Sequence, residues 1–450
     1  MRTALALTLS LATTSFLFAQ EVKLGAPLPR KAVLGASLAD LTPAEAASGP
    51  GVKILAVSPG LTAAGLNIQP GDILQTINGK KVAARGEVAP LVRTWVSGAN
   101  VTLKVLRAGK PVVVTGPAVE RPKMKDTDAY TVQYGQVESL GKRIRVITTV
   151  PKGTGPFPTV MLIGGIGAYS IDGEFAATAY GNVLESFAKT GYVVVRVDKP
   201  GQGDSEGPAY TDLGFDQEMD AYLQALRLTK QNPVVNKNAI AIFGHSMGGS
   251  FGPLVAEKEP VAALAVYGTL ARSWSEYVLE NTRRQDMLAG ATGGQTDQSI
   301  KQLYRVVNYL FEEGLSPAEV IKRKPDLKEY VNAMVPDGKT YSGVGLPFFQ
   351  ALAKKNLAAA WEKCPAQVLS IYGENDFISG RVDHELIAEL VNKVRPGSAE
   401  FKLLPASDHG FFQTTSPADS MAKWGRPGAA LNPAIIETLR AFFERTIKKA

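Results

Sequence analysis

The pattern of apolar and polar positions changes partway along the chain, and this change predicts two domains. Over residues 31–117, short apolar stretches are separated by tight turns, among them Asn78-Gly79, a dipeptide typical of two-residue hairpins. The strands expected there are Val52–Val57, Ile73–Ile77 and Val101–Leu106, with helices at 61–66 and 88–96. Residues 31–117 are therefore predicted to form a small β-rich domain.

Residues 129–450 show a different pattern, in which fully apolar stretches alternate with amphipathic ones. The buried strands predicted from it are Thr159–Ile163, Tyr192–Val197, Ala239–Phe243, Val261–Tyr267, Ala366–Tyr372 and Ala399–Leu404. The stretch 274–355 is helix-like and shows no core strand. We expect an α/β fold here, a doubly wound and mostly parallel sheet with a helical cap inserted at 274–355. Residues 118–128 are the expected linker.

The N-terminus has a pattern of its own. After Met1-Arg2, Ala4–Phe18 is mostly apolar, and Ala19-Gln20 offers a small residue for cleavage. This is typical of a secretory signal peptide, predicted at residues 1–19, and no other stretch is long and apolar enough to cross a bilayer. The sequence therefore predicts an exported protein, periplasmic or secreted, without stable membrane insertion.

Charge and cysteine content narrow the function classes. The net charge of +7 is spread along the chain, apart from Lys322-Arg323-Lys324, which is more typical of a solvated helix end than of a nucleic-acid site. The single cysteine, Cys364, excludes an internal disulfide, so an exported chain of 450 residues must rely on its hydrophobic cores. Neither nucleic-acid binding nor a metal or organic cofactor is expected.

One short motif indicates the chemistry. Gly244-His245-Ser246-Met247-Gly248 follows the apolar strand Ala239–Phe243 and precedes a helix expected from Pro253 onward. A nucleophile elbow has this arrangement and holds its serine on a strained strand-to-helix turn. The flanking glycines fit because a Cβ at either position would collide with the neighbouring strand or helix. Ser246 is the predicted nucleophile.

A serine hydroxyl needs a base to take its proton, and the chain has only three histidines. His409 lies in a loop after the last predicted strand, where a base can reach over the edge of the sheet. His245 adjoins Ser246 and is predicted to pack beside the elbow, whereas His384, at a helix start, is predicted to lie at the surface. His409 is therefore the predicted base.

The acid that orients this base is predicted to be Asp376, in the loop after the strand Ala366–Tyr372. Asp408 is a competitor, although a residue next to a histidine rarely reaches its Nδ1 atom. Glu374 and Asp383 are better explained as loop and helix-start charges.

The charge that develops on the substrate oxygen needs backbone N–H donors held in place before the reaction. One predicted donor is Met247, the residue after the nucleophile. The other is expected in the glycine-rich loop after Thr159–Ile163, where Ile166 is preferred and Gly165 or Gly167 are the alternatives. A phosphate-binding loop is excluded because the G-x-x-x-x-G-K-[ST] pattern is absent.

From Tyr130 onward the sequence resembles the α/β-hydrolase superfamily, and within it bacterial esterases and serine aminopeptidase-like members. The stretches that carry the resemblance are Leu162–Gly167, Asp198–Ser205, the elbow Gly244–Gly248, Tyr372–Asp376 and Asp408–Gly410. Their order implies a triad of Ser246, Asp376 and His409. The sequence departs from many relatives at Gly164, where histidine is common, and at Pro200, where arginine is frequent.

The first domain resembles a PDZ domain, in particular those of bacterial periplasmic serine proteases. The resemblance lies in the run from Val57 to Leu66, in Gln69–Leu74 and in Ile77-Asn78-Gly79. It implies that the loop and strand Leu34-Gly35-Ala36-Ser37-Leu38 capture a peptide C-terminus by strand addition. The alternative is that the groove docks the chain's own second domain.

These observations together predict an exported serine hydrolase that cleaves small-molecule carboxylic esters through an acyl-enzyme. Two alternatives stay open. The first is a peptidase on the same fold that binds a substrate amine with Glu312-Glu313, although these residues also fit a charged helix end. The second is a catalytically degenerate protein whose main activity is PDZ-based binding.

Overall fold

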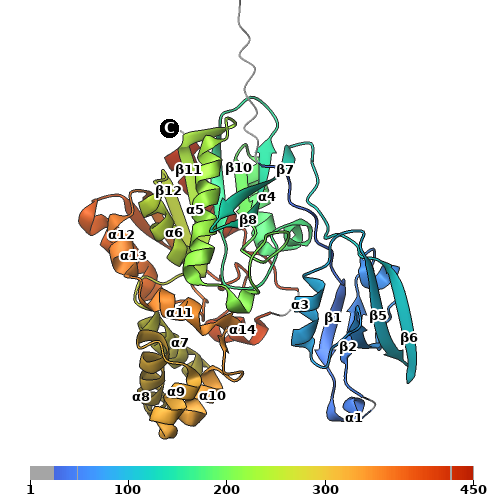
Figure 1. Ribbon diagram of the computed structural model, residues 1–450. Coiled ribbons are helices and arrows are strands. Elements are labelled where there is room, and N and C mark those ends of the chain that lie inside the picture. The colour runs from blue at the N-terminus through green and yellow to red at the C-terminus, as the bar shows by residue number, and fades with distance from the viewer. Residues whose placement is uncertain (1–24, 48, 426–427, 449–450) are drawn as a thin grey trace, which may run out of the picture.

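The computed structural model describes residues 25–47, 49–425 and 428–448, and within this range the chain folds into two domains that lie side by side (Figure 1). The predicted signal peptide lies outside the described residues. None of the described helices has the length and apolar character that crossing a bilayer would require.

The first domain is one antiparallel sheet with short helices packed against it. Its strands are β1 (Ala36–Asp40), β2 (Val52–Val57), β3 (Ile73–Ile77), β4 (Lys80–Lys81), β5 (Asn100–Arg107) and β6 (Lys110–Pro117). The order is β1-β2-β3-β5-β6, with β4 paired to β3, so β1 is an edge strand. Its helices are α1 (Pro43–Ala46), α2 (Thr62–Gly65) and α3 (Val88–Val92).

Two details of this domain differ from the sequence prediction. The helix expected at 88–96 stops at Val92 and is preceded by a 3₁₀ turn at Arg85–Glu87. Strand β6 was not predicted, because it begins with the exposed residues Lys110 and Pro111, which are typical of a turn. It pairs with β5 along its whole length and closes the sheet.

The second domain is an eight-stranded sheet in the order β16-β15-β12-β11-β9-β10-β8-β7. The strands are β7 (Tyr130–Ser139), β8 (Lys142–Pro151), β9 (Phe157–Ile163), β10 (Val193–Val197), β11 (Val235–His245), β12 (Ala263–Tyr267), β15 (Gln367–Gly373) and β16 (Ala399–Leu404). Strand β8 is antiparallel to both of its neighbours, and the strands from β10 to β16 are parallel. The carboxyl ends of the parallel strands therefore share one edge.

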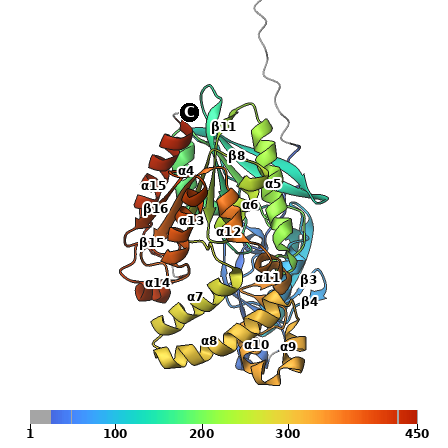
Figure 2. The same cartoon turned by 90° about the vertical axis from the view of Figure 1, so that its left-hand side faces the viewer.

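Helices cover both faces of this sheet, because its parallel strands are apolar on both sides. One face packs against α5 (Phe215–Gln231), α6 (Met247–Lys258), α12 (Leu357–Lys363) and α13 (Arg381–Val394). The other packs against α4 (Ala179–Lys189) and α15 (Ala434–Phe443), with α14 (Pro417–Lys423) nearby (Figure 2). Cys364 is buried in the core of the first face.

The insertion between β12 and β15 is helical and gathers beyond one end of the sheet (Figure 2). It contains α7 (Trp274–Leu288), α8 (Gly293–Val307), α9 (Pro317–Arg323), α10 (Lys328–Met334) and α11 (Leu346–Ala353), with a small hairpin of β13 (Thr340–Tyr341) and β14 (Val344–Gly345). Arg284 of α7 donates to the carbonyl oxygens of Phe377 and Ile378, at 3.0 and 2.8 Å. This cap is thereby tied to the loop that carries Asp376.

The prediction that His384 is a surface residue was wrong. Its ring is fully buried, with Nδ1 2.8 Å from the carbonyl oxygen of Gly380 and Nε2 3.0 Å from the amide of Thr269. Asp383 beside it is also buried and pairs with Arg272 at 2.8 Å. The first turn of α13 faces the protein interior because the side chains of His384 and Asp383 hydrogen-bond with the loop that follows β12.

Candidate active site

Ser246 stands on a sharp turn between β11 and α6, with φ 53° and ψ −123°, a strained conformation for a side chain other than glycine. A Cβ on Gly248 would come within 1.9 Å of the carbonyl oxygen of Ile163, so only glycine fits there. Helix α6 begins at Met247, directly after the serine, and not near Pro253 as predicted. The glycines of its first turn hid its start, because glycine is a poor helix former.

His409 and Asp376 meet at the carboxyl edge of the sheet. The Nδ1 atom of His409 lies 2.8 Å from Oδ2 of Asp376, and both side chains are buried. Burial alone would raise the pKa of Asp376, but the charge and hydrogen bond of His409, with further help from Ser379, lower it to about 2. Asp376 is thus an anion that fixes the orientation of the imidazole.

The other acidic candidates have different partners. Oδ1 of Asp408 accepts from the amides of Gly410 and Phe412, both at 2.8 Å, and shapes the loop that carries His409. Burial raises the pKa of Asp408. Glu374 accepts from the amide of Ala406 at 2.9 Å and is exposed.

Ser246 and His409 line one cavity of about 770 Å³. The structure has no hydrogen bond between these two side chains. Because Nδ1 of His409 is engaged by Asp376, Nε2 is the ring atom left to take a proton. In enzymes without substrate, a catalytic hydrogen bond is often longer than in the complex with substrate.

The loop after β9 lies beside the serine, and its amides differ in their partners. The amide of Gly165 donates to the hydroxyl oxygen of Tyr180 at 3.1 Å, and that of Gly167 to Tyr210 at 2.7 Å. The amide of Ile166 meets no acceptor among the described residues. Met247 is the first residue of α6, where an N–H has no partner within the helix. The two predicted oxyanion donors are therefore amides that stay available.

A buried lysine, which the sequence did not single out, holds this loop. Nζ of Lys199 donates to the carbonyl oxygens of Gly165 and Gly167, at 2.6 and 3.3 Å. It also pairs with Glu218 at 3.2 Å, and both side chains are buried. Burial lowers the pKa of Lys199, while the charge of Glu218 acts in the opposite direction. A sequence signal did exist, since Glu218 occupies the same helix face as the buried Phe215 and Tyr222.

His245 packs beside the elbow and also connects two parts of the site. Its Nε2 donates to the carbonyl oxygen of His409 at 2.8 Å, which leaves Nδ1 to accept from the hydroxyl of Tyr180. Burial, assisted by the nearby His409, lowers the pKa of His245 to about 3, so its ring is neutral. The hydroxyl oxygen of Tyr180 in turn accepts a hydrogen bond from the amide of Gly165. His245 thus links the loop of His409, through Tyr180, to the oxyanion loop.

The cavity wall is mostly apolar and rich in aromatic rings. Trp274 of the cap stacks on Tyr277 at 5.0 Å and on Phe349 at 4.9 Å, and all three line the cavity. Among the described residues that line it, none is an aspartate or glutamate. Glu312 accepts from Ser275 and Glu313 from Asn308, and neither side chain lines the cavity. The described residues also include no cluster of three or more His, Cys, Asp or Glu suited to a metal ion.

Family comparisons identify both parts of the chain. Residues 173–415 match the family model described as serine aminopeptidase S33, and residues 32–115 match that of the PDZ domain. The chain is 23% identical over 304 residues to the esterase EstD of Thermotoga maritima, covering 67% of this chain and 64% of EstD. It is 35% identical over 97 residues to the magnetosome formation protease MamE of Magnetospirillum gryphiswaldense, covering 20% of this chain and 13% of MamE.

A third relative is the esterase FrsA of Klebsiella pneumoniae, 30% identical over 127 residues, or 28% of each chain. The chain thus spans less than two thirds of the length of each of these relatives. A solved esterase from Thermogutta terrifontis superposes with a TM-score of 0.41 and 16% identity, covering 70% of this chain and 99% of that one.

Proposed function

This chain belongs to the serine aminopeptidase S33 family of α/β hydrolases, and we propose that it hydrolyses carboxylic esters through Ser246, His409 and Asp376. One observation carries the proposal: a serine on a nucleophile elbow shares a cavity with an imidazole that a buried aspartate orients. The esterases among its relatives support the same class of reaction.

In the proposed reaction, Oγ of Ser246 attacks the ester carbonyl while Nε2 of His409 takes its proton. The amides of Met247 and Ile166 donate to the oxyanion of the tetrahedral intermediate. His409 then returns the proton to the leaving alcohol, and an acyl-enzyme remains. Water, deprotonated by His409, attacks this acyl-enzyme and releases the acid and the free serine.

The composition of the cavity favours esters over peptides with a free amino terminus. An aminopeptidase binds the substrate ammonium group, and burying such a charge without a partner costs several kcal/mol. The described lining residues include no carboxylate that faces the cavity, and Glu312-Glu313 lie elsewhere. The rings of Trp274, Tyr277 and Phe349 favour a neutral substrate with an apolar or aromatic group.

Two chromogenic substrates, an ester and an aminoacyl anilide, distinguish an esterase from an aminopeptidase. The purified chain is expected to hydrolyse p-nitrophenyl butyrate, with leucine p-nitroanilide cleaved far more slowly. Ser246→Ala is expected to lower ester turnover by about 10³-fold or more, as loss of a triad nucleophile does. Anilide cleavage as fast as ester cleavage, and abolished in Ser246→Ala, would instead establish a peptidase.

The proposal extends to location and to the first domain. Residues 1–19 act as the signal peptide of an exported protein, periplasmic or secreted. Fractionation of cells that express the full chain or a chain without these residues tests this, and retention of both forms in the cytoplasm would contradict it. The PDZ domain, through Leu34-Gly35-Ala36-Ser37-Leu38, binds a peptide C-terminus.

A further inference from the structure

The proposed oxyanion donor Ile166 is oriented through its own peptide unit. Its amide shares a planar trans peptide with the carbonyl group of Gly165, so the N–H points opposite to the C=O. The carbonyl oxygen of Gly165 accepts hydrogen bonds from Nζ of Lys199 at 2.6 Å and from the hydroxyl of Tyr169 at 2.9 Å. The positions of Lys199 and Tyr169 therefore set the direction of the Ile166 N–H. The positive charge of Lys199 also polarises this peptide, which makes the N–H a stronger donor.

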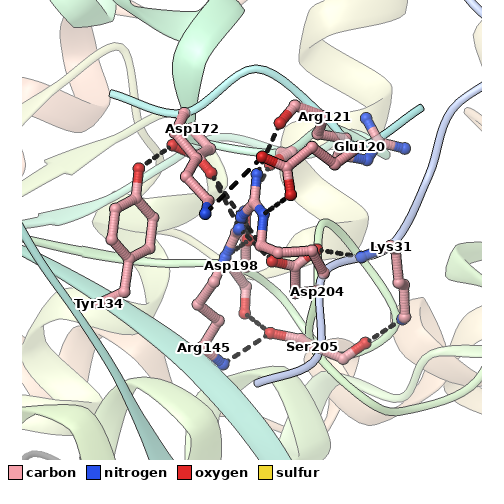
Figure 3. Close-up of polar contacts among 12 residues, drawn as sticks. Lys31, Glu120, Arg121, Tyr134, Arg145, Asp172, Asp198, Asp204 and Ser205 are labelled. Carbon is pink, nitrogen blue, oxygen red and sulfur yellow. Dashed lines mark hydrogen bonds and ion pairs between the residues drawn. The ribbon is translucent and has the colours of Figure 1, made fainter. Parts of the chain in front are cut away.

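Lys199 and Tyr169 come from different loops. These loops are joined by a largely buried charge cluster, which comprises Arg30, Arg145, Asp172, Asp198 and Asp204 (Figure 3). Lys199 directly follows Asp198 in the loop after β10, whereas Tyr169 lies in the loop after β9. Oδ1 of Asp198 accepts from the amide of Ile171, two residues after Tyr169, at 2.9 Å. Nε of Arg145, on β8, donates to Oδ2 of Asp198 at 2.6 Å. One carboxylate thus holds the backbone close to both donors of the Gly165 carbonyl group.

Arg30 enters the charge cluster from outside the hydrolase domain. Its Nη1 donates to Asp172 at 2.9 Å and to Asp204 at 2.5 Å. Nη1 of Arg145 donates to the same two carboxylates, at 2.9 and 2.6 Å. Asp172 belongs to the loop after β9 and Asp204 to the loop after β10. Arg30 and Arg145 therefore each join the two loops.

The charge of Arg30 keeps the two loops together. Without it, the guanidinium of Arg145 would face three buried carboxylates, because it pairs with every aspartate of the cluster. The neighbouring Lys31 directs its Nζ to a backbone carbonyl oxygen of the loop after β10, at 2.6 Å. Buried carboxylates that lack a matching cation repel one another. Asp172 and Asp204 lie on different loops, so this repulsion would push the loops apart.

The backbone of Arg30 is held by the first domain. Its carbonyl oxygen accepts from the amide of Ser97 at 3.0 Å, and the amide of Ala32 donates to the carbonyl oxygen of Trp95 at 3.1 Å. Nη2 of Arg30 donates to the carbonyl oxygen of Arg121 in the linker at 2.8 Å, and the side chain of Arg30 is only 13% exposed. The loops that orient the oxyanion donor are therefore held by a residue that the hydrolase domain does not contain.

We propose that Arg30 is a positioning residue of the catalytic site and acts on the oxyanion hole through the charge cluster. The inference rests on the proposed esterase function and involves no ligand of the first domain. Arg30 holds the loops after β9 and β10 together, and side chains of these loops fix the carbonyl group of Gly165 and with it the N–H of Ile166. Because the oxyanion forms only during the reaction, the effect of Arg30 falls on kcat and not on KM.

Steady-state kinetics of the full-length protein with p-nitrophenyl butyrate test the role of Arg30. Arg30→Gln is expected to lower kcat by about tenfold and to keep KM within about twofold of the parent. Arg143→Gln is the matched control, because Arg143 pairs with Glu206 at the surface, 2.9 Å from Nε to Oε1, close to the same loop. This control is expected to keep kcat within about twofold. Urea unfolding checks that both variants are folded under the assay conditions. A kcat of Arg30→Gln within twofold of the parent would overturn the proposal.

Gly173→Ala disturbs the same contact without removing a charge. A Cβ on Gly173 would lie 2.3 Å from the carbonyl oxygen of Pro122 in the linker, and the φ of Gly173 lies outside the left-handed region. The variant is therefore expected to push the linker away from the loop after β9 and to lower kcat by about fivefold. Since both changes act on one contact, the double variant with Arg30→Gln is expected to have a kcat within about twofold of Arg30→Gln alone. Losses that multiply in the double variant would overturn this common cause.

A trifluoromethyl ketone separates positioning of the oxyanion hole from a general loss of structure. Oγ of Ser246 adds to the carbonyl carbon of 1,1,1-trifluoropentan-2-one and His409 takes the hydroxyl proton, so the bound hemiketal carries an oxyanion. In Arg30→Gln its affinity is expected to fall by about the same factor as kcat/KM, whereas that of 1,1,1-trifluoropentan-2-ol, which forms no oxyanion, is expected to stay within about twofold.

Binding of both compounds is followed by ¹⁹F NMR, which needs no turnover. A ketone affinity that is unchanged in Arg30→Gln, or an equal loss of affinity for ketone and alcohol, would overturn the role of Arg30. Absence of ester hydrolysis by the parent protein would instead refute the esterase proposal, and the ketone would still test whether Arg30 orients the oxyanion donor.

Discussion

Gly268→Ala tests whether the position of His409 controls the reaction. Gly268 follows β12 and has a φ of +64°. A Cβ at this position would lie 2.8 Å from Nδ1 and 2.9 Å from Cε1 of His409, and 3.2 Å from Oδ2 of Asp376. The added methyl group would thus press on the hydrogen bond between the proposed base and the proposed acid.

The size of the effect follows from these contacts. Ordinary contact with a Cβ starts at 3.4 Å, so the ring must move by about 0.6 Å from its 2.8 Å position. A shift of this size away from Asp376 takes the 2.8 Å hydrogen bond past the usual limit of about 3.2 Å. A misplacement of about 1 Å costs about 10²-fold in rate, so we expect kcat to fall by about 30- to 100-fold. The left-handed backbone adds a cost of about 1–2 kcal/mol in the free energy of unfolding.

The assay is kcat and KM for p-nitrophenyl butyrate, together with urea unfolding. Gly314→Ala is the matched control, because Gly314 has a similar φ of +71° and a Cβ added there would have nothing within 4 Å. It is expected to lose similar stability but to keep kcat within about twofold. A Gly268→Ala enzyme with kcat within threefold of the parent would refute the assigned role of His409.

Three further single substitutions, one of them also combined with a second change, test other parts of the site. Asp376→Asn is expected to lower kcat by about 10³–10⁴-fold with little change in KM, because the imidazole loses its orientation; a loss below tenfold in steady-state assays would contradict this. Lys199→Met is expected to lower kcat by about tenfold or more and to destabilise the fold by about 3–5 kcal/mol, because Glu218 stays buried without its partner. In the double variant that combines Lys199→Met with Glu218→Gln, the urea midpoint should recover but kcat should not. Recovery of both would refute the role of Lys199 in positioning the oxyanion loop. His245 has a pKa of about 3 in the fold and 6.5 as a free side chain, so the unfolded chain takes up a proton that the folded chain does not as pH falls below 6.5. The contribution of neutral His245 to the free energy of unfolding is therefore fully present above pH 6.5 and falls by about 1.4 kcal/mol per pH unit below it. In urea unfolding, His245→Gln should reduce the loss of stability between pH 7 and pH 5. A pH dependence that is unchanged in this variant would contradict the low pKa assigned to His245.

The elements that position the serine were predictable because each has a strong local cause. A buried strand, a turn crowded with small residues and a helix must follow one another for Ser246 to be exposed on its elbow. Only three histidines exist, and only His409 follows the last strand. Its contact with Asp376 then follows from the parallel sheet, in which the loops after β15 and β16 are neighbours.

Features that depend on contacts across the fold were missed. The sequence predicts an exposed position for His384 at the start of a helix. Its burial comes only from the packing of α13 against the loop after β12. Lys199 follows β10 and Glu218 lies on α5, and their pairing depends on how the two elements cross. Arg30 lies just before the predicted domain of residues 31–117, yet it enters a buried cluster with Asp172 and Asp204. Glu218 does share a helix face with the buried Phe215 and Tyr222, but spacing along the chain does not identify the partner that each of these groups meets.

Reaction of Ser246 with a fluorophosphonate tests the central claim most directly, because this reagent forms a covalent bond only with an activated serine. Mass spectrometry of the folded wild-type protein is expected to show one adduct, located on the peptide that contains Ser246. His409→Gln is expected to slow its formation by about 10³-fold or more, since the base that activates the hydroxyl is gone. The absence of an adduct on Ser246 in the folded wild type, or equal labelling rates in both proteins, would contradict the account.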